Sequence, residues 1–199
     1  MKNFIEVYDN ALSKDECKSI IDFFEETNIC QDENGFMCKK EGMTGFPPRV
    51  DKNIKNSTDI GMSFNLSGHY INQMIMKSLA KHTRKYIENN IELKLISTWG
   101  ILDYYNLQKY EPNQAYFGLH CENEGPNFGI NRVLVWMFYL NTVTDDGGTY
   151  FDNYDLTLNA VEGRCVIWPA YWTHMHRGIV SKTESKYIVT GWFNFIDNV

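Results

Sequence analysis

The sequence predicts an α+β protein in which helices come first and an antiparallel sandwich or barrel, a jelly roll, follows. Two amphipathic helical stretches lie within residues 1–94. From Leu95 onward, short runs rich in Ile, Val, Tyr, Trp and Phe alternate with turn signals such as "DDGG" and "VEG". Short strands without intervening helices are typical of antiparallel sandwiches and barrels. We therefore expect a single domain over residues 1–199, with a helical and loop layer over 1–94 and a jelly-roll core over 95–199.

The first helix is predicted to begin after Ser13. Ser13 and Glu16 form the Ser-x-x-Glu pattern of a capping box. Apolar residues follow the capping box at helical spacing: Cys17, Ile20, Ile21 and Phe24. The second predicted helix is "HYINQMIMKSLAKHTRKYIENN", and its apolar side carries Ile71, Ile75, Leu79 and Tyr86.

Residues 28–63, between the two helices, are predicted to form a long loop region. They are polar and glycine-rich, include Pro47-Pro48 and show no lasting periodicity. Loops of this length in compact domains are usually functional or mobile. With its basic residues in an otherwise acidic chain, this region is a candidate cover for a substrate, and a solvated charged loop is the alternative.

Composition narrows the classes of function. The formal charge of −6 argues against nonspecific nucleic-acid binding, which needs a basic surface. No apolar run suggests a signal peptide or a membrane span. The five cysteines are scattered and include no Cys-x-x-Cys pair. This pattern favours a reducing compartment over a disulfide framework, and we expect a soluble, cytoplasmic protein.

The segment "GLHCENEG" places His120 and Glu122 two residues apart. On a strand, both side chains would point the same way, so an imidazole and a carboxylate could close on one metal ion. A third ligand could come from "WTHMHRG", in which His174 and His176 are two residues apart and would lie on the same face of a strand. Two histidines and one carboxylate on one face leave open positions, as in non-haem Fe(II) oxygenases. Taken alone, a pair with this spacing is more often two ordinary strand residues.

Over roughly residues 95 to 195 the sequence resembles the 2-oxoglutarate/Fe(II) dioxygenases. The likeness is to the prolyl 4-hydroxylase-like group and its short phage-encoded members. It rests on "YLNTVTDDGGTYF" and on a histidine followed ten residues later by a basic and an aromatic residue. The resemblance implies a double-stranded β-helix (jelly roll) with N-terminal helices packed on one sheet. It also implies Fe(2+), 2-oxoglutarate and O2 as cofactors, with ascorbate as a candidate accessory reductant.

Carried over residue by residue, the resemblance assigns His120 and Glu122 as the first two iron ligands. His176 becomes the third, because Lys186 lies ten residues beyond it. In the family that lysine pairs with the distal carboxylate of 2-oxoglutarate, and Tyr110 matches a tyrosine that hydrogen-bonds the same group. A buried dianion needs such a cation.

The chain departs from the family pattern at three positions. Glu122 replaces the commoner aspartate, Val135 stands where a threonine is frequent, and the spacing from Tyr110 to His120 is one residue longer. Arg132 has two readings: it contacts the substrate or the metal ligands, or it forms a structural salt bridge.

The function implied is hydroxylation of a substrate C–H bond, coupled to oxidative decarboxylation of 2-oxoglutarate. Halogenating members lack a carboxylate at the position of Glu122, so its presence favours hydroxylation. Peptidyl proline is the first candidate substrate, and a free amino acid or another small metabolite is the second. A non-catalytic jelly-roll module that binds a small molecule and a zinc hydrolase are alternatives from other classes. The phage-encoded relatives are consistent with a virus-encoded protein acting in the host cytoplasm.

Overall fold

The computed structural model describes residues 2–30, 37–45, 47–64, 69–102, 104–125 and 129–196. The α-helices in this part of the chain are α1 (Lys14–Glu26) and α2 (Tyr70–Asn89), and the 3-10 helices are η1 (Ile91–Lys94), η2 (Asp152–Tyr154) and η3 (Trp172–His174). The strands are β1 (Glu6–Tyr8), β2 (Lys39–Glu41), β3 (Thr58–Ser63), β4 (Trp99–Gly100), β5 (Tyr104–Tyr110), β6 (Arg132–Tyr139), β7 (Thr149–Phe151), β8 (Leu156–Leu158), β9 (Cys165–Pro169), β10 (His176–Gly178) and β11 (Lys186–Phe195).

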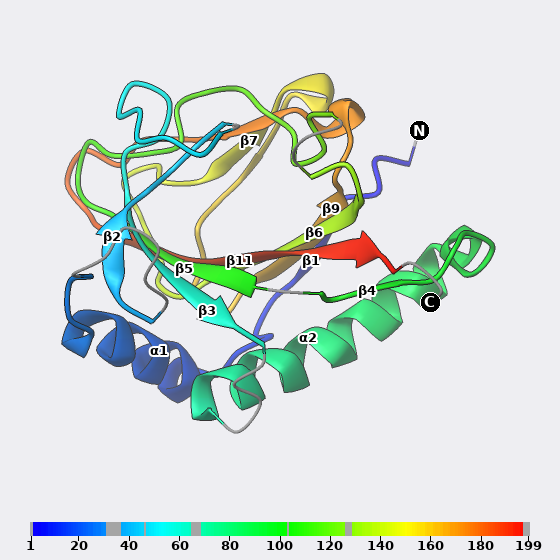
Figure 1. Ribbon diagram of the computed structural model, residues 1–199, viewed down its shortest axis with the longest axis horizontal. Helices are drawn as coiled ribbons and strands as arrows, with labels where there is room; N and C mark the ends of the chain where they lie inside the picture. Colours follow the sequence, from blue (N-terminus) through cyan, green and yellow to red (C-terminus); the bar gives the residue numbers. More distant parts are fainter. Residues whose placement is uncertain are drawn as a thin grey trace.

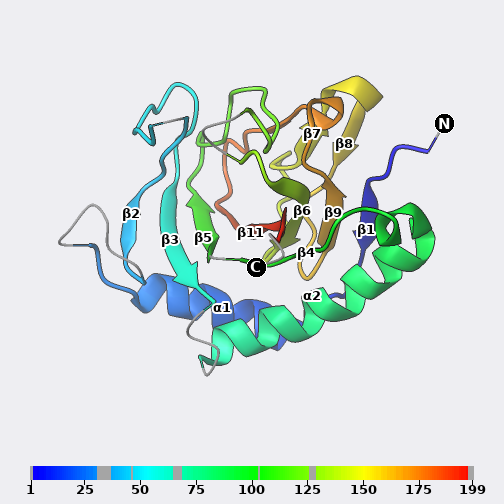
Figure 2. The same ribbon diagram turned by 45° about the vertical axis from the view of Figure 1, so that its right-hand side comes forward.

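Two antiparallel sheets and a layer of helices make up the fold, which confirms the predicted jelly roll. The main sheet has the order β1-β9-β6-β11-β5-β3-β2, with β4 paired to β11, and the minor sheet has the order β10-β7-β8. Both α-helices lie against one side of the main sheet, and β7 of the minor sheet lies on the opposite side (Figures 1 and 2). Three main-sheet strands (β1, β2 and β3) come from the first 94 residues, so that part of the chain supplies more than helices and loops.

The central strand β6 is buried along its whole length because both of its faces are covered. Trp136 and Phe138 belong to the apolar cluster shared with the helices. Val135, Met137 and Tyr139 belong to a second cluster, which also includes Phe151 of the minor sheet. Alternate residues of a strand point to opposite faces. An uninterrupted apolar run is therefore what a strand sandwiched between two layers requires.

Both predicted helices are confirmed. In α1 the Ser13 hydroxyl accepts a hydrogen bond from the Glu16 backbone N–H at 3.2 Å, and the Glu16 carboxylate accepts one from the Ser13 N–H at 2.8 Å. The apolar side of α2 is buried as expected, and none of the described helices combines the length and apolar character that a membrane crossing requires.

The prediction of one continuous loop over residues 28–63 is wrong for part of that range. β3 is a six-residue strand within the main sheet, and β2 forms its edge; residues 31–36 and 46 lie outside the described residues. Ile60 and Met62 join the core beneath the helices. Asp59 and Gly61 line a cavity on the opposite face. The sequence of β3 therefore alternates between core-facing and cavity-facing residues, but this pattern is short.

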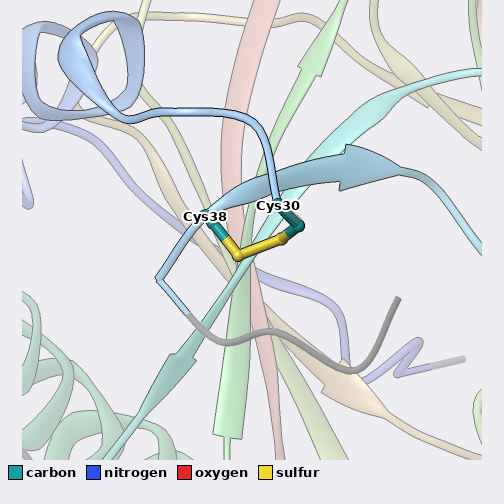
Figure 3. The surroundings of a disulfide bond; sticks show 2 residues. All are labelled: Cys30 and Cys38. Carbon is teal, nitrogen blue, oxygen red and sulfur yellow. A yellow bond between two sulfur atoms is a disulfide. The ribbon is translucent and has the colours of Figure 1, made fainter. Parts of the chain in front are cut away.

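The expectation that the cysteines avoid disulfides is also wrong. Cys30 and Cys38 are bonded, with their Cα atoms 4.9 Å apart (Figure 3). Their segments are held together because the Cys30 backbone N–H donates to the Lys39 carbonyl at 2.8 Å. This proximity follows from the pairing of the two segments, which the spacing of the cysteines does not encode. The other cysteines are free and buried.

Candidate metal centre

His120, Glu122 and His176 converge at one end of the barrel. His120 and His176 form an isolated antiparallel bridge, in which each backbone N–H donates to the other residue's carbonyl at 3.0 and 2.8 Å. The Glu122 N–H donates to the carbonyl of Ala170 at 3.0 Å. The prediction that His120 and Glu122 lie on a regular strand is therefore wrong, because only this single bridge forms. Their spacing of two residues nevertheless directs both side chains to the same site.

The three side chains present a compact set of donor atoms. The Nε2 atoms of His120 and His176 each lie 3.6 Å from Oε1 of Glu122. One potential ligand atom from each residue lies within 4.8 Å of the others. The Nδ1 atom of His120 is 2.9 Å from the Gly118 carbonyl, and Nδ1 of His176 is 2.9 Å from the His174 carbonyl. A carbonyl only accepts, so each Nδ1 carries the proton and each Nε2 lone pair faces the site.

The second oxygen of Glu122 is held away from the histidines. Its Oε2 accepts hydrogen bonds from Trp192 Nε1 at 2.8 Å and from Arg132 at 3.2 Å. The Arg132 guanidinium also stacks on the Trp192 ring, at 3.7 Å from its centroid. Arg132 therefore contacts a candidate metal ligand, and this contact is itself a salt bridge, so both interpretations of Arg132 apply. We call these contacts of Trp192 and Arg132 with Oε2 the clamp. Because they occupy Oε2, Oε1 is the oxygen that remains available to bind an ion.

The charge states of these groups suit a divalent cation. Burial raises the pKa of Glu122, but the neighbouring His120 and His176 side chains and the charge of Arg132 outweigh burial, so the pKa falls well below its ordinary value. Burial lowers the pKa of His176. The carboxylate is thus ionised and that imidazole is neutral, as metal ligation requires. Two imidazole nitrogens and one carboxylate oxygen are the donor set that Fe(II) takes in a facial triad, so the residues present fit this metal.

A cavity of about 390 Å³ extends from the three residues into the barrel. Lys186, on β11, lines it opposite Tyr110, its register partner on β5. The side chain of Lys186 is only 5% exposed, and none of the described carboxylates lies within ion-pair distance of it. Burial lowers its pKa to about 8. A buried cation without a counter-ion is costly, so this end of the cavity is suited to an anionic ligand.

His174 does not share a strand face with His176, contrary to the sequence expectation. His174 is the last residue of the 3-10 helix η3. Its ring points away from the candidate metal site, and its Nε2 lies 2.7 Å from the Asn3 carbonyl oxygen. Its ring is a packed core group, and its backbone carbonyl orients His176.

Several cavity residues were missed by sequence reasoning. Tyr116 stacks on His120 with ring centroids 3.8 Å apart and an interplanar angle of 11°. Asp59 and Gln108 form a buried polar group near Tyr110. Lys55 is one of the basic residues of the predicted loop region, and it is buried in an ion pair with Asp59. The alternation in β3 was the only signal for Asp59, and no local pattern marked the others.

Two histidines and one carboxylate that face one cavity are the ligand set found in mononuclear non-haem Fe(II) oxygenases. Residues 105–194, from β5 to β11, match the sequence profile described as "2OG-Fe(II) oxygenase superfamily". This part of the chain is therefore similar to 2-oxoglutarate- and Fe(II)-dependent oxygenases, which supports the predicted dioxygenase activity and the predicted cofactors Fe(II), 2-oxoglutarate and O2.

Solved structures with the same fold include prolyl hydroxylases of low sequence identity. The viral collagen prolyl hydroxylase of Paramecium bursaria Chlorella virus-1, in complex with 2-oxoglutarate, has 17% identity and a TM-score of 0.65, with 97% of each chain covered. A Pseudomonas putida prolyl-4-hydroxylase has 15% identity and a TM-score of 0.67, covering 97% of this chain and 94% of that one. A Trichoplax adhaerens prolyl hydroxylase bound to a hypoxia-inducible-factor peptide fragment has 12% identity and a TM-score of 0.71, covering 98% and 84%. No curated protein sequence is similar enough to count as a match.

Proposed function

We propose that the protein hydroxylates a C–H bond of a peptide substrate, with peptidyl proline as the first candidate. The observation that carries this proposal is that one cavity holds the His120–Glu122–His176 cluster and Lys186, which has no ion-pair partner among the described residues. When bound, Fe(II) and 2-oxoglutarate supply the oxidising chemistry: O2 and 2-oxoglutarate are consumed, succinate and carbon dioxide are formed, and one oxygen atom enters the substrate C–H bond.

In this proposal each residue of the cluster has a distinct task. His120, Glu122 and His176 hold the iron through Nε2, Oε1 and Nε2. Trp192 and Arg132 fix the carboxylate of Glu122 so that it ligates through one oxygen, which leaves coordination positions for 2-oxoglutarate and O2. A carboxylate at this position also favours hydroxylation over halogenation.

Lys186 binds the distal carboxylate of 2-oxoglutarate through a charge-assisted hydrogen bond. Tyr110 lies beside that position, with its ring centroid 5.0 Å from Lys186 Nζ. The pairing of β5 with β11 places both residues at the same end of the cavity, away from solvent. This arrangement orients the co-substrate toward the iron ligands and limits the entry of water.

Exposed aromatic and apolar side chains are among the residues that line the cavity, and they could contact a substrate that extends beyond it. Tyr104 and Trp192 form an edge-to-face pair there, with centroids 6.0 Å apart. Met43 and Pro48, from the region expected to cover the substrate, also line the cavity. The viral and Trichoplax relatives act on or bind peptides according to their descriptions, which adds support for a peptide substrate.

A succinate-release screen tests this function. The purified protein, loaded anaerobically with Fe(II) and 2-oxoglutarate and then exposed to O2, is offered proline-containing peptides and free amino acids. We expect peptide-dependent succinate and a product heavier by one oxygen atom. Turnover of free amino acids alone would transfer the proposal to a small-metabolite hydroxylase. Turnover with zinc but not iron would favour a hydrolase, and failure to bind iron and 2-oxoglutarate would favour a binding module.

A further inference from the structure

A row of buried polar side chains crosses three neighbouring strands on the cavity face of the main sheet. Asp59 on β3 pairs in register with Gln108 on β5, and Tyr110 on β5 pairs with Lys186 on β11. Gln108 and Tyr110 are two residues apart, so both face the cavity. Asp59, Gln108 and Tyr110 are each at most 5% exposed, so every polar atom in the row needs a partner.

The partners of Asp59 fix the orientation of the Gln108 amide. The Asp59 carboxylate accepts from Lys55 at 2.5 Å, from Ser57 at 2.8 Å and from Gln108 Nε2 at 3.2 Å. An ionised carboxylate only accepts, so Gln108 must turn its NH2 group toward Asp59. Its carbonyl oxygen Oε1 then points to Tyr110, whose hydroxyl is 3.0 Å away. The Tyr110 hydroxyl must therefore be the donor in this bond.

Tyr110 has only one proton to give. Burial holds the pKa of Tyr110 well above its ordinary value, so the hydroxyl keeps this proton. The distal carboxylate of 2-oxoglutarate, bound at Lys186, would be a second acceptor for it. If the hydroxyl turned to the co-substrate, Oε1 of Gln108 would be left buried without the donor that it has in this structure.

We propose that Gln108, oriented by Asp59, is a positioning residue that competes with 2-oxoglutarate for the Tyr110 proton and so weakens co-substrate binding. The proposal rests on the proposed function, in which Lys186 binds the distal carboxylate. It assigns a role to the Asp59–Gln108 pair, which does not touch the candidate metal ligands. Removing the Gln108 acceptor should free Tyr110 to donate fully to the co-substrate.

A double-mutant cycle tests the competition. Gln108→Met keeps the length of the side chain, removes the acceptor and leaves Asp59 paired with Lys55 and Ser57. The dissociation constant of 2-oxoglutarate is measured by calorimetry, with Mn(II) replacing Fe(II) to prevent turnover. We expect Gln108→Met to tighten binding at least ~5-fold, equivalent to about 1 kcal/mol. Tyr110→Phe should weaken binding at least ~5-fold more in the Gln108→Met background than in the wild type.

A ligand control locates the effect at the distal carboxylate. 2-Oxovalerate keeps the 2-oxo acid group but lacks that carboxylate, so its affinity should be unchanged by Gln108→Met. Three results would overturn the competition. Gln108→Met could tighten the binding of both ligands equally, it could leave 2-oxoglutarate binding unchanged or weaker, or it could show no coupling with Tyr110→Phe. Gln108→Leu replaces Gln108→Met if the latter does not fold. If Lys186→Met binds 2-oxoglutarate as well as the wild type does, Lys186 is not the anion-binding group and the competition is overturned. If the wild type does not bind 2-oxoglutarate, the proposed function fails instead.

Discussion

Replacing Lys186 with methionine should stabilise the protein without co-substrate and, at the same time, weaken 2-oxoglutarate binding. Methionine keeps much of the apolar stem and removes a buried charge that has no described ion-pair partner. Burial lowers the pKa of Lys186 from 10.5 to about 8. At about 1.4 kcal/mol per pKa unit, this shift corresponds to a cost of about 3 kcal/mol for the charged form.

The sign of the pH dependence follows from which state binds more protons. Below pH 8 the lysine is charged in both the folded and the unfolded protein, so the whole cost is present. Between pH 8 and 10.5 the unfolded chain holds more protons, so the stability of the wild type rises with pH. Urea unfolding at pH 7 should therefore show the Lys186→Met variant to be more stable by about 1–3 kcal/mol, and the difference should shrink toward pH 10.

Co-substrate binding should change in the opposite direction. Loss of a charge-assisted hydrogen bond costs about 1.5–3 kcal/mol, so Lys186→Met, like Lys186→Ala, should raise the 2-oxoglutarate requirement at least ~10-fold. Metal affinity without 2-oxoglutarate should barely change. Wild-type affinity for 2-oxoglutarate should fall as the pH rises above 8, because a neutral Lys186 must first take up a proton. If the variant is no more stable and its 2-oxoglutarate dependence is unaltered, Lys186 is not the anion-binding group. The assignment then passes to Lys182 or Arg177.

Three further predictions test the site and the fold. His176→Ala should abolish iron-dependent succinate formation while circular dichroism shows an intact fold. His174→Ala should keep measurable turnover and lose about 1–3 kcal/mol of stability in urea unfolding. Anomalous scattering that locates iron bonded to the His174 ring would contradict this prediction. Trp192→Phe removes a donor to Glu122 and should weaken Mn(II) binding about 10-fold in a calorimetric titration, and unchanged affinity would refute the clamp. Cys30→Ser opens a disulfide of sequence separation 8 and should cost about 2.5 kcal/mol in urea unfolding. A reductant should lower the urea midpoint of unfolding of the wild type to that of the variant, and it should leave the midpoint of the variant unchanged.

Several features could be predicted from the sequence because they depend only on interactions between residues that are close together in the chain. The start of α1 follows from the Ser13–Glu16 capping box, whose bonds join residues three apart and need no tertiary contact. The apolar stripe of α2 likewise depends only on helical periodicity. The spacing of His120 and Glu122 brought both side chains to one site although no regular strand formed there.

Tertiary structure alone decided the rest, because those features depend on pairing between distant segments. β3 became a sheet strand through its pairing with β5, and this pairing placed Asp59 beside Gln108. The bond between Cys30 and Cys38 depends on the pairing of their segments. The sequence favoured His176 over His174 only by resemblance. In the structure, η3 turns the His174 ring toward Asn3, while the bridge to His120 aims His176 at the site. Short polar strands carry a weak local signal, and a side chain's direction at a strand end is set by the neighbouring segment it pairs with.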